Sequence, residues 1–476
     1  MAEQQTSFKQ SLGLVDATMI VAGSMIGSGI FIVSADITRN VGSAGWLIFV
    51  WVITGFMTIT AAVSYGELSG MFPKAGGQYV YLKEAYNPFT GFLYGWSFFA
   101  VIQTATIAAV GVAFSKFLAY LVPELGNNFF LFDAGITKIY SGQLVAIFII
   151  FLLTYINSKG IKEGKFIQTL FTSAKLLALF GLIIFGFLLV KQSFWAENWK
   201  TGFTATQDFG VNGTVGLAAS GWEPISGFVL MGAIAAAMVG SIFSSDAWNN
   251  VTFIAAEIKN PKRNIGLSLF LGTLIVTIIY VCTNLMYINV LPLHDIAFAP
   301  QDRVAVSASN AIFGNIGTYV IAVLIMISTF GCNNGLILAG ARVYYTMAQD
   351  GLFFKKTGML NKNAVPEYAL WIQAVVASLL CLSGKYGDLL TMVSFVVVIF
   401  YVLTIIGIFI LRVKRPDAGR PYKAFGYPVL PAIYILLAVA FCIGLVWTSP
   451  KYSLWGLGIM LLGIPLYFIA ISQQKK

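Results

Sequence analysis

Two stretches of the sequence place small and polar residues in the middle of long apolar segments. The stretches are "GSMIGSGIF" (Gly23–Phe31) and "GSIFSSDAWNN" (Gly240–Asn250). Glycine and serine favour helix ends and turns over helix interiors, so each stretch predicts a break in a helix. Backbone groups freed inside a membrane are tolerated only where they line a cavity or bind a ligand. These two stretches are therefore the first candidates for a functional site.

The chemistry available at a helix break comes from the peptide dipoles. The half-helix after a break begins with N–H groups and a partial positive charge, which suits a carboxylate. The half-helix before a break ends in carbonyl groups, which suit an ammonium. Two facing breaks could hold both ends of a zwitterion such as an α-amino acid, and Ser28 would add a hydroxyl. The alternative is a glycine-rich packing face between helices, which is common in membranes.

Two ionisable side chains lie near the middle of apolar segments. Lys175, in "FTSAKLLALFG", stands near the middle of its segment, where a lysine costs about 2.5–3.5 kcal/mol to insert. We interpret it as a fixed or titratable cation that braces the broken helix, with snorkelling to the interface as the structural alternative. Asp246 could cap the half-helix that follows it. It could equally meet a substrate cation or relay protons.

Other polar positions give a weaker signal. Gln103, Asn333 and Asn334 are candidates for pocket lining, although such residues more often join helices by hydrogen bonds. Phe243, immediately before the second break, could be a lid over the site. The only histidine, His294, lies in a polar loop, and the four cysteines have no CxxC spacing. We therefore expect no metal site, no cofactor and no enzymatic centre.

The elements that must position these residues are membrane helices. The chain has 476 residues, of which 58% are hydrophobic and 10% charged, whereas a soluble domain has roughly 25% charged residues. Apolar runs of this length cross a bilayer as α-helices. The twelve predicted spans are 12–40, 44–66, 89–121, 141–157, 166–190, 225–257, 265–291, 316–348, 367–383, 387–411, 428–448 and 452–472.

The two interrupted stretches fall on the first and sixth spans. Because five helices is an odd number, equivalent halves of the chain would cross the membrane in opposite directions, as an inverted repeat. We predict a cytoplasmic tail at residues 1–11, a first repeat at 12–191 (helices 1–5) and a second at 225–412 (helices 6–10). Residues 428–472 would form two accessory helices outside the repeat.

The charges predict how the chain sits in its membrane. Most of the 29 Lys and Arg residues fall in the N-terminal tail and in alternate loops, which places both termini in the cytoplasm of a multi-pass cell-membrane protein. The net charge of +10 is then explained by the cytoplasmic rim and its anionic lipids, and no nucleic-acid partner is expected. The start "MAEQQTSFKQ" is a polar tail and not a removable signal peptide.

Five motifs in order carry a family resemblance that covers nearly the whole chain. They are "GSMIGSGIF", "YGELSGMFPKAGGQYVYLKEAYNPFTGFLYGW", "FTSAKLLAL", "AWNNVTFIAAEIKNPKRNI" and "RPDAGRPYKAFGYP". The chain resembles the L-type amino-acid transporter-like branch of the amino acid–polyamine–organocation (APC) superfamily. The resemblance implies an all-α, twelve-helix, five-plus-five inverted-repeat fold of the LeuT type, with helices 1 and 6 discontinuous. It also implies secondary transport of amino acids by alternating access, through exchange or proton coupling.

The resemblance further implies which residues contact the substrate. The carboxylate would meet the backbone from Ile26 to Gly29, and the ammonium would meet carbonyls at Met25, Phe243 and Asp246. Phe243 matches an aromatic gate of the family. The implied substrate-binding residues are Met25, Ile26, Gly27, Ser28, Gly29, Phe243, Asp246 and Ala247.

Three comparisons with the family pattern refine these expectations. Lys175 matches a helix 5 lysine that stands where sodium-coupled relatives keep a metal ion, which argues against sodium coupling there. The chain reads "DAWN" where eukaryotic relatives usually read "GGWN", so Asp246 replaces a small residue and the side-chain preference cannot be carried over. The loop at 122–142 lacks the cysteine that eukaryotic members use to bind an ancillary glycoprotein. A stand-alone prokaryotic carrier without a disulfide-linked subunit is predicted.

Two other classes of protein remain as alternatives. A channel would need a continuous polar pore or charged rings, whereas the sequence shows isolated polar positions. A transporter-like sensor that binds without carrying usually signals through an appended domain, and both tails here are short. The expected partners are an amino-acid substrate, the lipid bilayer and, as a candidate coupling ion, the proton.

Overall fold

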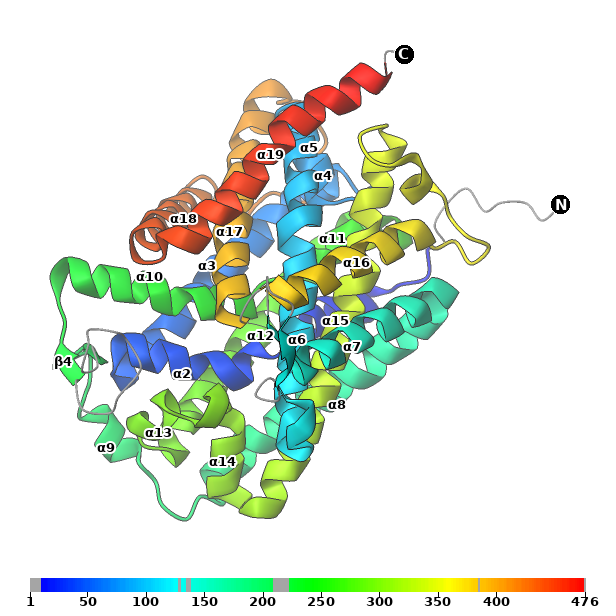
Figure 1. Ribbon diagram of the computed structural model, residues 1–476. Coiled ribbons are helices and arrows are strands. Elements are labelled where there is room, and N and C mark those ends of the chain that lie inside the picture. The colour runs from blue at the N-terminus through cyan, green and yellow to red at the C-terminus, as the bar shows by residue number, and fades with distance from the viewer. Residues whose placement is uncertain (1–9, 127–129, 134–137, 209–221, 384–385, 475–476) are drawn as a thin grey trace.

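The computed structural model describes residues 10–126, 130–133, 138–208, 222–383 and 386–474, and most of them are helical (Figure 1). Within these ranges, ten helices are long and apolar enough to cross a membrane, and one bent pair of helices makes an eleventh span. The shorter helix α16 (Glu367–Ser383) corresponds to the remaining predicted span. The prediction of an all-α membrane fold of about twelve helices is confirmed.

The first part of the chain contains the first broken span. Its elements are α1 (Leu14–Met25), α2 (Gly29–Val41), α3 (Ala44–Met71), α4 (Gln78–Ala85), α5 (Pro88–Ser97), the π-helical segment η1 (Phe98–Ile102), α6 (Gln103–Leu121), η2 (Pro123–Leu125), β1 (Phe130–Asp133), β2 (Lys138–Tyr140), α7 (Ser141–Lys159), α8 (Ile161–Leu188), α9 (Trp195–Trp199), β3 (Thr206–Asp208) and β4 (Trp222–Pro224). Together, α5, η1 and α6 form one continuous span.

The second part contains the second broken span. Its elements are α10 (Gly227–Ser244), α11 (Asn250–Phe253), η3 (Ala255–Glu257), α12 (Pro261–Val290), α13 (Leu293–Ala297), η4 (Pro300–Asp302), α14 (Val304–Phe313), α15 (Asn315–Gln349), η5 (Lys355–Gly358), α16, α17 (Tyr386–Lys414), α18 (Val429–Thr448) and α19 (Pro450–Gln474).

Local sequence explains where helices in the first part of the chain end and begin. Helix α2 ends at Gly42, which has φ +51°, a left-handed conformation that glycine adopts without steric cost. The hydroxyl of Ser43 then accepts a hydrogen bond from the Trp46 N–H and caps α3. Asn87 caps α5 in the same way, and Pro88 occupies the first helical position.

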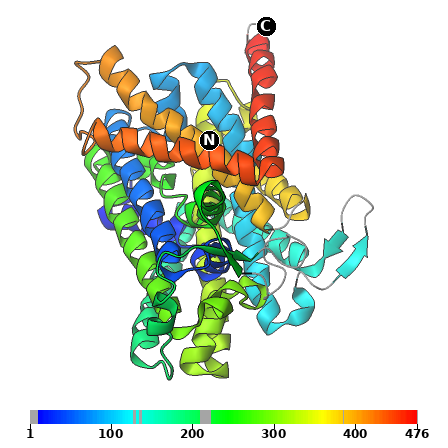
Figure 2. The ribbon, with the colours of Figure 1, turned by 90° about the vertical axis from the view of Figure 1, so that its left-hand side faces the viewer.

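Four short strands form two antiparallel pairs at the ends of spans, which the helical prediction did not include. Strand β1 pairs with β2, with Phe130 opposite Tyr140 and an irregularity before Phe132. Strand β3 pairs with β4, with Gln207 opposite Glu223. Figure 2 shows the β1–β2 hairpin projecting to the right of the bundle.

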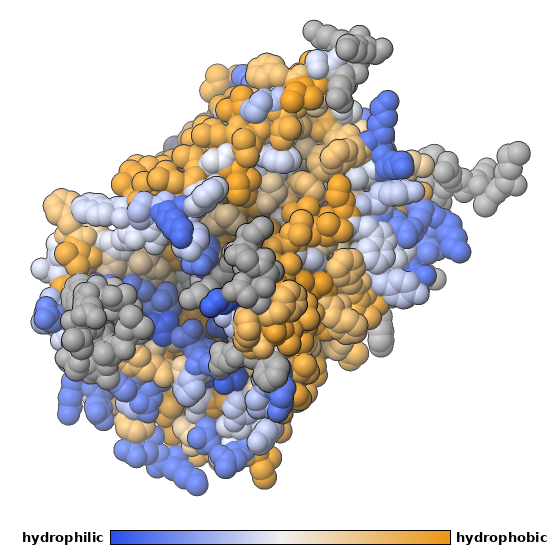
Figure 3. All heavy atoms as spheres, in the orientation of Figure 1, coloured by the Kyte–Doolittle hydropathy of each residue, from blue (hydrophilic) through white to orange (hydrophobic). Residues whose placement is uncertain are grey.

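The surface and the interior of the bundle differ as a bilayer requires. Figure 3 shows a hydrophobic band that crosses the molecule. Hydrophilic side chains gather on either side of this band, at the lower left and at the right of the view in Figure 3. Large aromatic side chains fill the centre, among them Trp51, Trp248 and Tyr280, each 2% exposed or less. The two broken spans lie in this interior, where α2 and α10 pack side by side and are seen nearly end-on in Figure 2.

A buried ion pair and three backbone hydrogen bonds join distant segments of the chain near the N-terminus. Arg342 of α15 and Glu257 of η3 are buried and lie 3.1 Å apart, Nε to Oε1. The backbone N–H groups of Ser11 and Leu12 bond the Glu257 carbonyl, and the Lys259 N–H bonds the Leu12 carbonyl. The segment before α1 is therefore fastened to the segment that follows the second break.

Candidate functional site

The first break lies at residues 26–28, between α1 and α2, whose axes bend by 42°. Ile26 has φ −74° and ψ 88°, outside the helical region, and the Gly27 N–H donates to the Met25 carbonyl at 2.8 Å. Because α2 begins at Gly29, the N–H groups of its first turn have no partner within the helix. They present the positive end of the α2 dipole to the break.

The second break lies at residues 245–249, between α10 and the single turn α11. The Ser245 N–H bonds the Ser241 carbonyl at 2.9 Å, and the Asp246 N–H bonds the Phe243 carbonyl at 3.2 Å, so the chain turns away from the helix axis. Ala247 has φ +63°, a left-handed conformation that is strained for a residue with a Cβ. The prediction that helices 1 and 6 are discontinuous is confirmed.

The two breaks lie directly against each other. A Cβ atom on Gly29 would stand 1.8 Å from the Ser244 hydroxyl oxygen and 2.6 Å from the Ser244 Cβ, so this approach requires glycine. The hydroxyl of Tyr280, on α12, is 3.0 Å from the Met25 carbonyl and 3.0 Å from the Ser244 carbonyl. A phenol has one proton to donate, so Tyr280 serves the carbonyl ends of α1 and α10 in turn.

Lys175 lies at the carbonyl end of α1. Its side chain is fully buried, and its ammonium donates to the carbonyls of Gly23 and Ile26 at 2.6 Å each. A cation is favourable at this end because the helix dipole is negative there. Cys332, on α15, adds a weak thiol donor to the Ser24 carbonyl at 3.2 Å. The Lys175 ammonium therefore binds the broken helix and does not extend to the membrane interface.

These donors change what the first break can offer to a ligand. The Met25 carbonyl, the expected partner of a ligand ammonium, already accepts a hydrogen bond from Tyr280. Because the Gly27 N–H also donates to this oxygen at 2.8 Å, both of its lone pairs are engaged, and an ammonium would have to displace one of the two donors. The N–H groups at the first break are also partly engaged, because Gly27 donates to Met25 and Phe31 donates to the Ser28 carbonyl at 3.1 Å. Among the described residues, this leaves the N–H groups of Ser28 and Gly29 for a ligand.

A large cavity leads toward the two breaks. Its volume is about 1,610 Å³, and α2, α6, α10 and α17 supply much of its lining. We call this cavity the vestibule. Charged side chains occupy one wall: Asp302 lies 2.9 Å from Arg39 and 3.8 Å from Lys116, and Arg39 is also 3.5 Å from Asp36. Among the residues described, Tyr386 lines the vestibule, whereas Ser28 and Phe243 lie beyond it.

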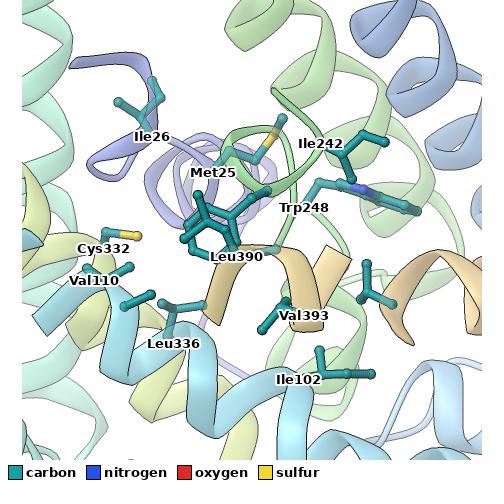
Figure 4. Packing of buried hydrophobic residues seen from close by; sticks show 14 of the residues in the cluster. Met25, Ile26, Ile102, Val110, Ile242, Trp248, Cys332, Leu336, Leu390 and Val393 are labelled. Atoms are coloured by element: carbon teal, nitrogen blue, oxygen red, sulfur yellow. The ribbon is translucent and has the colours of Figure 1, made fainter. Parts of the chain in front are cut away.

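Apolar side chains also surround the two breaks (Figure 4). Figure 4 shows Met25, Trp248, Cys332 and Leu390, from four different segments, gathered about the first and second breaks. All four are buried. A low-dielectric wall strengthens the interaction of the peptide dipoles with a charged ligand, because little water competes.

Asp246 points toward α17 and does not cap α11. Its carboxylate accepts a hydrogen bond from the Tyr401 hydroxyl, and the residue that precedes α11 is Asn249. The rings of Tyr65, Trp248 and Tyr401 pack edge-to-face or tilted around this pair, with centroids 4.8–5.9 Å apart. In the described part of the chain, no lysine or arginine is recorded in an ion pair with Asp246. A pocket of about 20 Å³ beside it has room for a water molecule.

The three candidates for pocket lining lie at contacts between helices. Gln103 donates from Nε2 to the Leu336 carbonyl at 2.6 Å, and Asn333 donates to the Ile107 carbonyl at 3.3 Å. Asn334 accepts a hydrogen bond from Asn157 at 2.8 Å. None of the three lines the vestibule as described. Their geometry agrees with the plainer interpretation, in which they join α15 to α6 and α7.

Sequence reasoning missed two tyrosines that the structure brings to the site. Tyr280 links the two breaks, and Tyr386 lies 3.0 Å from Ser28, hydroxyl to hydroxyl. Tyr280 stands within the predicted span 265–291 and Tyr386 directly before the span 387–411, among 21 tyrosines. No spacing or neighbouring motif distinguishes them from tyrosines that only pack, so the sequence held no signal for either.

Comparison with known proteins places these features in a family. The amino acid permease family matches residues 12–471. The chain is 30% identical over 477 residues to the large neutral amino acids transporter small subunit 2 of Homo sapiens, which covers 99% of this chain and 82% of that protein. It is 28% identical over 480 residues to the Asc-type amino acid transporter 1 of Mus musculus (100% and 84%). It is 26% identical over 471 residues to the b(0,+)-type amino acid transporter 1 of Homo sapiens (98% and 89%).

Proposed function

Because the chain belongs to the amino acid permease family of the APC superfamily, we propose that it moves amino acids by alternating access at the paired helix breaks. Amino acid transport follows from the family and from its likeness to L-type transporters. The observation that carries the proposed site is the contact between Gly29 and Ser244, which sets the two breaks face to face inside the bundle.

The substrate carboxylate binds at the start of α2. The N–H groups of Ser28 and Gly29 and the hydroxyl of Ser28 lie there, at the positive end of a helix dipole, and the Gly27 N–H joins them when it leaves the Met25 carbonyl. The ammonium binds carbonyls at the ends of α1 and α10, where it takes the place of the Tyr280 proton. This arrangement recognises the part common to all α-amino acids and leaves the side chain to the surrounding pocket.

Lys175 replaces a metal ion as the cation that braces helix 1. Its two short hydrogen bonds fix the carbonyl end of α1 beside the substrate. In an alternating-access cycle α1 has to tilt, so these two bonds are candidates for making and breaking between states. Lys175 therefore acts on turnover through the position of α1.

Asp246, with Ala247 next to it, forms the floor of the substrate site at the second break. There it sets which amino-acid side chains the transporter prefers. The carboxylate is buried, its donors are the Tyr401 hydroxyl and the Ala247 backbone N–H, which are both neutral, and no basic residue is recorded beside it, so it favours a substrate that supplies a positive charge. Replacement of Asp246 by glycine, the residue of the "GGWN" pattern, removes that preference. A substrate profile unchanged by Asp246→Gly would show that the carboxylate serves only the local fold.

The chain functions in the cell membrane with both termini in the cytoplasm and without a disulfide-linked subunit. All four cysteines lie within helices: Cys282 on α12, Cys332 on α15, Cys381 on α16 and Cys442 on α18. None stands in the loop at 122–142. The human relative is called a small subunit, so purification of the expressed chain under non-reducing conditions tests whether a partner is attached.

One experiment tests the proposed function and its coupling. The purified chain is reconstituted in liposomes and supplied with each of the twenty labelled amino acids, with and without a pH gradient and with and without internal substrate. Accumulation that needs internal substrate indicates exchange, and accumulation driven by the pH gradient indicates proton symport. Binding of a labelled amino acid without accumulation would indicate a sensor and would overturn the proposal.

A further inference from the structure

We infer that Tyr386 is the lid between the vestibule and the substrate site, and that it positions Ser28 for the substrate carboxylate. The inference rests on the proposed function, because it concerns how that site is reached. Tyr386 is the first residue of α17 and lines the vestibule, while the residue as a whole is only 8% exposed. It is thus the residue at which the open cavity ends and the buried site begins.

The Tyr386 hydroxyl is hydrogen-bonded to the Ser28 hydroxyl, the polar side chain of the first break. Its oxygen lies 3.0 Å from the Ser28 Oγ, and Ser28 is 1% exposed. Ser28 supplies the only side-chain hydroxyl among Ile26, Gly27, Ser28 and Gly29, the residues of the carboxylate site. With Tyr386 in place, that hydroxyl has a protein partner instead of a substrate oxygen. A substrate carboxylate that enters the site can therefore replace the Tyr386 hydroxyl as the hydrogen-bond partner of Ser28.

Residues of two further helices, α10 and α6, contact the Tyr386 ring. It meets the Phe243 ring edge-to-face, with centroids 6.3 Å apart and an interplanar angle of 78°. The Lys116 ammonium of α6 lies 5.2 Å from the centroid of the same ring. One side chain thus contacts a residue of the first break, a residue just before the second break and a cation of the vestibule wall.

These contacts link the lid to the movement of α2. Lys116 lies 3.8 Å from Asp302, and Asp302 lies 2.9 Å from Arg39, which belongs to α2. A tilt of α2 would therefore alter two contacts at once, the one between Ser28 and Tyr386 and the one between Arg39 and Asp302. The hydroxyl of Tyr386 has to leave Ser28 before substrate binds, and the ring has to return before the vestibule closes.

The chain carries a thiol that reports whether the lid is open. Cys332 is 2% exposed and lies behind the lid, where its sulfur would be 3.0 Å from a Cβ on Gly27. Cys381 lines the vestibule in front of the lid. Replacement of Cys282, Cys381 and Cys442 by alanine leaves Cys332 as the only thiol in the full chain. The rate of its reaction with a membrane-impermeant methanethiosulfonate then measures access to the site.

The reagent is applied to one membrane face at a time, in right-side-out and inside-out vesicles that contain the single-thiol chain. From the vestibule face, Tyr386→Ala should raise the reaction rate of Cys332 about tenfold or more, because both ring and hydroxyl are lost. Tyr386→Phe keeps the ring, so loss of one hydrogen bond should raise the rate roughly two- to tenfold. Ser28→Ala should match Tyr386→Phe, and the double variant should add little.

Tyr140→Phe is the matched control, because Tyr140 also lines the vestibule and its hydroxyl is not bonded to Ser28. An unchanged rate in Tyr386→Ala, or an equal rise from both membrane faces, would overturn the lid. Additive effects of Tyr386→Phe and Ser28→Ala would overturn the link between them. Amino-acid uptake by the single-thiol parent is measured in the same vesicles. If the parent transports but the reaction rate of Cys332 does not respond to Tyr386→Ala, only the lid is refuted. If the parent does not transport, the proposed function itself fails.

Discussion

The tight contact between the two breaks makes Gly29→Ala the most informative substitution in the chain. The new methyl group would stand 1.8 Å from the Ser244 hydroxyl oxygen, 2.6 Å from its Cβ and 3.1 Å from its Cα. Rotation of the hydroxyl does not relieve the clash, because the Cβ and the backbone are also too close. The two broken helices must therefore move apart by more than about 1 Å, an overpacking that costs roughly 1–3 kcal/mol.

The overpacking destabilises the conformations in which the two helix breaks are in contact. These are the conformations that we propose bind substrate. We expect uptake of labelled amino acid into proteoliposomes to fall about ten- to hundredfold, since each 1.36 kcal/mol corresponds to a factor of ten. The matched control is Gly458→Ala in α19, where an added Cβ meets nothing within 4 Å. Both variants are compared at equal amounts of reconstituted, monodisperse protein.

A second substitution tests the cause of the loss. Ser244→Gly removes the Cβ and hydroxyl that clash with Ala at position 29, so the double variant should recover a substantial part of the uptake lost in Gly29→Ala. Contacting residues are expected to show such non-additivity. Uptake by Gly29→Ala equal to that of Gly458→Ala, or no recovery in the double variant, would refute the face-to-face arrangement of the breaks.

Three other substitutions test separate parts of the site. Ser28→Trp should abolish uptake, because an indole fills the first break; unchanged transport would place the site elsewhere. Lys175→Met removes the ammonium donor of the Gly23 and Ile26 carbonyls, of which Ile26 keeps a long hydrogen bond from Ser328 at 3.4 Å, and a buried unpaired group costs about 1–3 kcal/mol. Turnover should fall at least tenfold while substrate Kd changes less, as measured by uptake rates and binding on the same preparation. Asp246→Gly should lower the uptake of cationic relative to neutral amino acids in a competition assay, and an equal change for both would assign the carboxylate to folding.

The sequence predicted the breaks because their signal is local. Glycines and serines in the middle of an apolar run oppose the helix whatever surrounds them, so Gly23–Gly29 and Gly240–Asp246 could be recognised without any tertiary information. The spacing of the two runs by five spans then suggested that they belong together. The boundaries of the repeats, at 12–191 and 225–412, stay predictions of the sequence.

The partners of the breaks could not be predicted, because they come from distant parts of the chain. Tyr280 and Tyr386 reach the site from α12 and α17, and their roles depend on the orientation of one hydroxyl each. The sequence also left the role of polar residues in mid-span open. Gln103 and Asn333 looked like pocket lining, yet an amide inside a membrane needs a hydrogen-bond partner wherever it lies. Helices in polar loops, such as α4 and α13, lack the apolar length by which spans are recognised.

The position of a bound substrate tests the central claim most directly. The measurement is a cryo-electron microscopy map of the full chain in nanodiscs with a saturating amino acid taken from the transport panel. We expect density between the end of α1 and the start of α2, with the carboxylate at the N–H groups from Gly27 to Gly29 and the ammonium toward the end of α10. Substrate density elsewhere in the bundle, with both breaks in contact only with protein groups, would contradict the account.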